Sequence, residues 1–89
     1  MDPYRIVWKK SASKELRKLE RKHISSIITA IEGLAANPFP AGNKKLIGSE
    51  HTFRIRVLNY RVIYSVENNE LLIEVIRVGH RKDVYRVKS

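Results

Sequence analysis

The sequence predicts an α+β fold with the element order β-α-α-β-β-β, in which two N-terminal helices pack on one mainly antiparallel sheet of four strands. Two observations predict this fold. Residues 9–38 carry apolar side chains at helical spacing, and residues 51–79 hold three strand-like runs separated by short turns. The length of 89 residues fits one compact domain. We therefore expect a single domain over residues 1–89.

The first strand and both helices are expected before Pro38. The run YRIVW is rich in β-branched and aromatic residues, which favour strands. In KKSASKELRKLERK a narrow apolar stripe predicts a helix that Ser11 or Ser13 caps, with Glu15 in its first turn. The segment HISSIITAIEGLAANP has a wider apolar stripe and ends at Asn37, because the residue before a proline disfavours helix.

Three further strands follow a loop. The segment FPAGNKKLIGSE holds two prolines and two glycines and is expected to be loop. The runs HTFRIRVL and YRVIYSVE both alternate between apolar and polar residues, so they predict a hairpin with a short LN turn. After a second turn at NN, the run LLIEVIRVG is apolar throughout, as is typical of an interior strand.

Charge is the strongest compositional signal. The chain has 18 Lys and Arg against 9 Asp and Glu, a net charge of +9. This balance favours a polyanionic partner, with nucleic acid first and an acidic masking protein second. A protein that is merely basic is the alternative. There is no cysteine, no apolar run long enough to span a bilayer and no secretory signal, so we expect a cytoplasmic protein with no membrane partner.

Arginines are expected to converge on the hairpin. Alternation places Arg54 and Arg56 on one face of a strand, roughly 7 Å apart. Arg61 joins them if it opens the next strand and pairs across the turn. Solvated arginines on an outer face are the ordinary explanation, but like charges on adjacent strands repel, and a bound phosphate relieves that repulsion.

The closing stretch VGHRKDVYRVKS adds three candidates. His80 suits proton transfer near neutral pH, and its alternative is an exposed loop histidine. Arg81 is a further phosphate ligand. Tyr85 either stacks on a base or packs the tail against the domain. With no cysteine, and no histidine partner at ligand spacing for His23 or His51, we expect neither a metal site nor a cofactor.

Several short motifs, taken in order, resemble the RelE/ParE toxin superfamily of type II toxin–antitoxin systems, and more closely its RelE-like branch. They are IVWKKSASKELRKL, NKKLIG, FRIRV, YRVIY and VGHRKDVYR. The resemblance implies a metal-free endoribonuclease that cleaves messenger RNA in the ribosomal A site and so inhibits translation. It also implies a RelB-like antitoxin that neutralises the toxin, in a complex that binds operator DNA through the antitoxin.

The resemblance also implies roles for particular residues. The 2′-OH of the RNA attacks the adjacent phosphorus and leaves a 2′,3′-cyclic phosphate. The implied catalytic set is Arg54, Arg56, Arg61, His80, Arg81 and Tyr85. Members of this branch carry lysines at the strand pair, where this chain has Arg54 and Arg56. Arginine deprotonates poorly, so His80 is a candidate to supply the proton chemistry.

Lysines outside this set are expected to contact RNA or the ribosome. They are Lys9, Lys10, Lys14, Lys18, Lys44 and Lys45. Two other functions stay open. One is inhibition of DNA gyrase, which characterises the ParE branch, and the other is a non-catalytic RNA-binding module.

Overall fold

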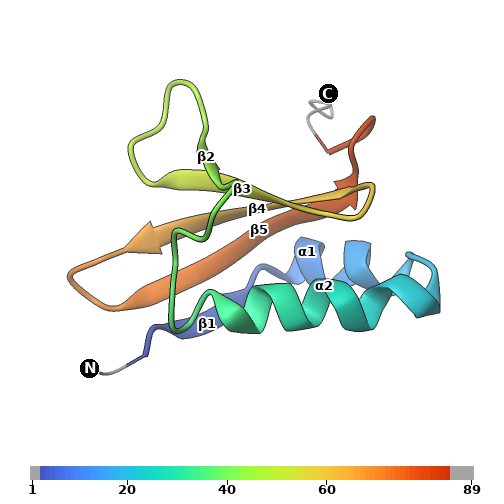
Figure 1. Cartoon of the computed structure of the whole chain (residues 1–89), viewed down its shortest axis with the longest axis horizontal. Coiled ribbons are helices and arrows are strands. Elements are labelled where there is room, and N and C mark those ends of the chain that lie inside the picture. The colour runs from blue at the N-terminus through green and yellow to red at the C-terminus, as the bar shows by residue number, and fades with distance from the viewer. Residues whose placement is uncertain (1–2, 85–89) are drawn as a thin grey trace.

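A five-stranded sheet with both helices on one face forms the protein, as a computed structural model of residues 3–84 shows (Figure 1). The elements are β1 (Arg5–Trp8), α1 (Lys10–Arg17), α2 (Arg21–Gly33), β2 (Lys44–Lys45), β3 (Thr52–Val57), β4 (Tyr60–Glu67) and β5 (Leu72–His80). The strand order across the sheet is β1-β5-β4-β3-β2. Only β1 and β5 are parallel, and every other pair is antiparallel.

The predicted α+β class and the element order are confirmed, but the strand number was one too low. The additional strand is β2, which lies inside the expected loop and pairs Lys44 with Arg54 and Lys45 with Phe53. A strand of two residues shows no alternation, so hydrophobic periodicity gives no signal for it. The predicted interior position of the last strand is confirmed, because β5 lies between β1 and β4.

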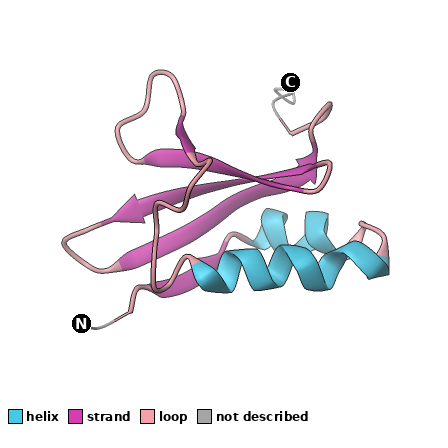
Figure 2. Ribbon diagram, in the orientation of Figure 1, coloured by secondary structure: helices cyan, strands magenta, loops and turns pink. Residues whose placement is uncertain are grey.

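The core lies between the helices and one face of the sheet (Figure 2). The helix α2 contributes the buried side chains of Ile27 and Ile31. Residues of the sheet that face it include Ile55 and its cross-strand partner Val62. Alternation then directs Arg54 and Arg56, the neighbours of Ile55, to the opposite face. The core packing thus determines the side on which the hairpin arginines lie.

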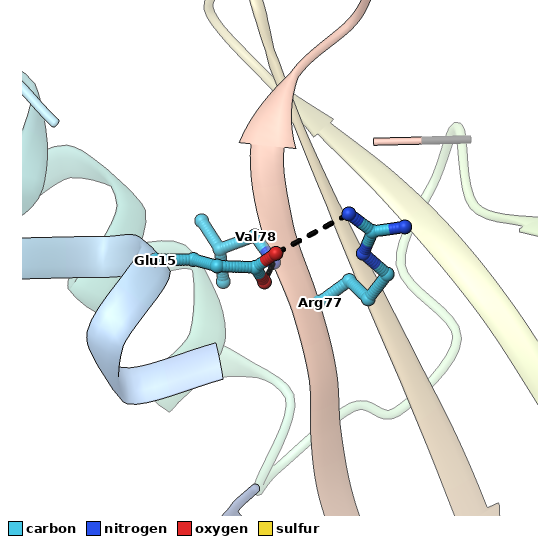
Figure 3. A network of polar contacts seen from close by, with 3 residues as sticks. All are labelled: Glu15, Arg77 and Val78. Carbon is cyan, nitrogen blue, oxygen red and sulfur yellow. Dashed lines mark hydrogen bonds and ion pairs between the residues drawn. The ribbon is translucent and has the colours of Figure 1, made fainter. Parts of the chain in front are cut away.

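The first helix begins earlier than its serines predict. It starts at Lys10 with Lys9 as N-cap and no side-chain capping bond, so the expected cap at Ser11 or Ser13 was wrong. Glu15 therefore falls in the second half of α1. Its carboxylate accepts hydrogen bonds from β5 instead of interacting with the helix N-terminus (Figure 3).

Candidate functional site

Cationic side chains meet on the sheet face that the helices leave uncovered. Arg56 in β3 lies directly opposite Arg61 in β4, so the two side chains share a face, with Cβ atoms about 5 Å apart. Arg54, two residues before Arg56, pairs with Lys44 of β2 on its other side. The predicted convergence of these three arginines follows directly from the register. We call Arg54, Arg56 and Arg61 the arginine face.

Arg54 is the buried member of the arginine face. Only 7% of its surface is exposed, and its Nη1 atom has no hydrogen-bond partner. Leaving a buried donor unsatisfied costs free energy on the order of 1–3 kcal/mol, and more when the group is charged. Arg56, by contrast, is exposed. A buried cation with an unused donor is a typical arrangement for binding an anion.

Arg61 and Arg81 are placed by the β3–β4 turn. Arg61 is half-buried, and its Nη1 donates a hydrogen bond to the Tyr60 carbonyl at 3.2 Å. The backbone N–H of Arg81 donates to the carbonyl of Asn59 at 2.9 Å, which holds the turn after β5 against the hairpin turn. The exposed Arg81 side chain therefore leaves the backbone at the same end of the sheet as Arg56 and Arg61.

His80 does not join the arginine face. It is the last residue of β5 and lies opposite Tyr60, whereas Gly79 lies opposite Arg61. Its ring packs edge-on against that of Tyr60 with centroids 6.1 Å apart, on the side where His23 Nδ1 lies 2.9 Å from the Tyr60 hydroxyl. His80 Nδ1 also accepts the backbone N–H of Lys82 at 3.2 Å. The geometry gives His80 a part in shaping the turn that carries Arg81.

Among the remaining predicted site residues, Tyr85 lies outside the described part of the chain, and the lysines fall into two groups. Tyr85 belongs to residues 85–89, which the structure does not describe. Lys44 and Lys45 are exposed on β2, beside Arg54 and Phe53 respectively. A second exposed group is carried by α1 and its two caps, at Lys9, Lys10, Lys14 and Lys18. Lys44 shares the face of Arg54, whereas Lys45, opposite the core-packed Phe53, shares the face that the helices cover.

A tyrosine that the sequence did not single out fixes the loop beside Arg54. The buried Tyr64 of β4 donates its hydroxyl proton to the Pro38 carbonyl at 2.7 Å, and Asn43 Nδ2 donates to the same hydroxyl at 3.4 Å. Burial raises the pKa of the Tyr64 phenol, and the hydrogen bond from Asn43 offsets part of that rise. Both ends of the 38–43 loop are thereby tied to the sheet. No periodic pattern in the sequence indicates these bonds.

The loop encloses a pocket of about 530 Å³ between α2 and the edge of β3. Arg54 and Arg56 line it together with Gly33 of α2. A second pocket, of about 430 Å³, adjoins Lys45, Ile47 and Arg54. Between residues 3 and 84, no three His, Asp or Glu side chains are grouped so as to hold a metal ion, and no helix of that segment is long and apolar enough to cross a membrane.

The fold and this face define a small, basic α+β protein whose exposed sheet surface suits an anionic partner. Residues 6–85 match the family described as "ParE toxin of type II toxin-antitoxin system, parDE". The chain therefore belongs to the ParE toxin family, within the RelE/ParE toxin superfamily. The predicted resemblance is confirmed at this level.

Relatives that carry RelE-type names cover nearly the whole chain. "Toxin RelG" of Mycobacterium tuberculosis is 27% identical over 85 residues, which is 94% of this chain and 98% of that protein. The RelE–RelB complex of Pyrococcus horikoshii contains a chain that superposes with a TM-score of 0.80 at 28% identity, covering 92% of this chain and 99% of that one. The isolated RelE toxin of Escherichia coli superposes with a TM-score of 0.77 at 25% identity, covering 96% of this chain and 88% of that one.

Proposed function

We propose that this toxin cleaves messenger RNA on the ribosome, with the arginine face as the site that binds the reacting phosphate. The observation that supports it is the convergence of Arg54, Arg56 and Arg61 on one uncovered face, with Arg54 buried and its Nη1 unpartnered. Guanidinium groups match phosphate oxygens by paired donors, so this face suits RNA better than it suits a neutral ligand.

The proposed reaction is an internal transfer of the phosphoryl group within the RNA. The ribose 2′-hydroxyl loses its proton to water, and its oxygen forms a bond to the adjacent phosphorus while the bond from phosphorus to the 5′-oxygen breaks and that oxygen takes up a proton from water. The products are a 2′,3′-cyclic phosphate and a 5′-hydroxyl. Arg54 and Arg61 stabilise the charge that builds on the non-bridging oxygens. Arg81 donates a hydrogen bond to the leaving oxygen, and Tyr85 orients the nucleophile or stacks on a base.

Ribosome dependence follows from the weak acid–base groups of this set. Arginine holds its proton near neutral pH, so the chain contributes positioning and charge rather than strong proton transfer. Positioning alone lowers barriers by up to about 7–11 kcal/mol where the geometry is favourable. The ribosome, together with the exposed lysines of α1 and β2, supplies that positioning in this proposal. The site of action is then the cytoplasm.

A RelB-like antitoxin is the proposed protein partner. Structures of related toxins carry titles such as "Crystal structure of archaeal RelE-RelB complex from Pyrococcus horikoshii OT3". The net charge of +9 favours an acidic partner surface. We further propose that the complex contacts operator DNA through the antitoxin, as the superfamily resemblance implies.

Primer extension on messenger RNA bound to purified ribosomes tests the proposal. Wild type is expected to produce stops in the A-site codon that are absent without ribosomes. Arg54→Ala and Arg61→Ala are each expected to lower the rate by about 10²–10³-fold, the effect of removing one preorganised donor. Absence of cleavage by wild type would refute the enzymatic function.

Gyrase inhibition is the second candidate, and the ParE description of the matching family favours it. A supercoiling assay with purified gyrase separates the two functions. Inhibition by the toxin at concentrations that leave ribosome-bound messenger RNA intact would establish the second candidate and exclude the first.

A further inference from the structure

The pocket between α2 and the β3 edge has the features of a ligand site. Its volume of about 530 Å³ falls in the range of roughly 300–1,000 Å³ that small-molecule sites occupy. Lys44, Arg54 and Arg56 line it, and no carboxylate does. Three cationic residues in a lining that holds no carboxylate favour an anionic ligand.

The opposite wall of the pocket is small and apolar. Ala30 and Gly33 of α2 form it, and the space where a Cβ of Gly33 would lie holds no atom within 4 Å. A flat ring fits such a wall. The wall therefore accommodates a planar group attached to the anion.

Two further polar residues, Asn37 and Thr29, line the same pocket. Asn37 Oδ1 accepts the backbone N–H of Phe39 at 3.1 Å, which orients the Nδ2 donors toward other partners. Thr29 of α2 is exposed and adds a hydroxyl that donates or accepts. A donor pair and a hydroxyl are the groups that read the hydrogen-bonding edge of a nucleobase.

We propose that this pocket binds one nucleotide of the RNA, with its phosphate on the Arg54 side and its base against Gly33, and thereby sets base preference next to the cleaved bond. The inference rests on the proposed ribonuclease function for its biological meaning. Binding itself needs no ribosome, so it is measured on the isolated chain. An acidic peptide is the competing occupant, because its carboxylates also satisfy Arg54.

The test is a ¹H–¹⁵N NMR titration of the full chain with 5′-AMP, 5′-GMP, 5′-CMP, 5′-UMP, inorganic phosphate and tetraglutamate at matched ionic strength. At least one nucleotide is expected to shift the amides of Thr29, Gly33 and Asn37 and to bind about tenfold more tightly than phosphate, since a base adds stacking and hydrogen bonds. Equal affinity for phosphate and all nucleotides overturns the base pocket. Preferential binding of tetraglutamate overturns it in favour of a protein ligand.

Gly33 provides a matched pair of variants. Gly33→Leu fills the pocket from the helix and is expected to weaken the preferred nucleotide about tenfold or more, whereas Gly33→Ala leaves affinity within about twofold. If Gly33→Leu does not fold, Thr29→Leu on the exposed face of α2 replaces it. Unchanged affinity in a folded filling variant overturns the site. Primer extension with wild type is run in parallel. If wild type cleaves messenger RNA but binds no nucleotide, this inference alone is refuted. If wild type binds a nucleotide but does not cleave, the ribonuclease function alone is refuted.

Discussion

The carboxylate of Glu15 in α1 pairs with the guanidinium of Arg77 in β5 at 3.3 Å, and its other oxygen accepts the backbone N–H of Val78 at 3.0 Å (Figure 3). The strand β1 pairs with β5 only as far as Val75, so the N–H of Val78 lies beyond the end of β1. Glu15 supplies the acceptor that a longer strand would have supplied. The bond attaches the helix layer to the strand that leads into Arg81.

Glu15→Ala is expected to destabilise the fold by about 1–3 kcal/mol, because the Val78 donor loses its partner and Arg77 loses a counter-charge. Glu15→Gln keeps an oxygen for Val78 and is expected to cost less. Urea denaturation followed by circular dichroism measures both. Glu20 is the matched control, since its pair with Lys22 is 3.5 Å long and mostly exposed. Glu20→Ala is expected to change stability by less than about 1 kcal/mol, and an equal loss in the two alanine variants would contradict the role of Glu15.

We expect Arg54 to lower the free energy of unfolding while it contributes to cleavage of messenger RNA. Arg54→Met removes a buried guanidinium with an unsatisfied donor, so its free energy of unfolding is expected to equal or exceed that of wild type by up to about 2 kcal/mol. Cleavage of ribosome-bound messenger RNA is expected to fall about 10²–10³-fold in the same variant. Denaturation and primer extension on one preparation check both halves. A variant that is both less stable and inactive would show that Arg54 is needed for the fold, not for the phosphate.

The opposed pair Arg56 and Arg61 makes stability sensitive to anions. Like charges directly opposite each other on adjacent strands repel, and bound phosphate or screening salt reduces that repulsion. The melting temperature of wild type is expected to rise more in sodium phosphate than in sodium chloride of equal ionic strength, since a bound anion stabilises by mass action. Arg56→Gln, with one charge removed, is expected to lose most of the difference. The same phosphate-specific rise in Arg56→Gln would place the anion elsewhere.

Tyr64 is expected to make the protein sensitive to alkali. Burial raises its pKa above 10.0, the ordinary value of a tyrosine, in the folded chain, so above that pH the unfolded chain loses the proton first. The stabilisation is fully present below pH 10.0 and is lost as pH rises through the folded-state pKa. Urea titrations from pH 8 upward measure this loss, and Tyr64→Phe is expected to show a shallower fall. The variant also leaves the Pro38 carbonyl without its donor, at a cost of about 1–3 kcal/mol near neutral pH. Parallel pH curves for the two proteins would contradict the assignment.

The sequence was sufficient for the fold class and for the arginine face because both follow from alternation. Once Ile55 is assigned to the core, Arg54 and Arg56 must face away from it, and the two-residue turn sets Arg61 opposite Arg56. Features that depend on single contacts between distant segments were not predictable. The burial of Arg54, the Tyr64–Pro38 bond and the Glu15–Arg77 pair join residues with no periodic relation.

His80 shows how one residue of strand length changes a prediction. The strand-like run was expected to end at Gly79, which would leave His80 in a loop. In the structure β5 continues to His80, so alternation places Gly79 with Arg61 and His80 with Tyr60 on the other face.

His80→Ala is therefore expected to keep cleavage within about tenfold of wild type, while Arg81→Ala, which removes a donor to the leaving oxygen, is expected to lose about 10²-fold or more. Single-turnover cleavage on programmed ribosomes compares the two, with Lys82→Ala in the same turn as the control. A pH–rate profile of wild type adds a second criterion: a limb that disappears in His80→Ala would show that this histidine transfers a proton in the reaction despite its position.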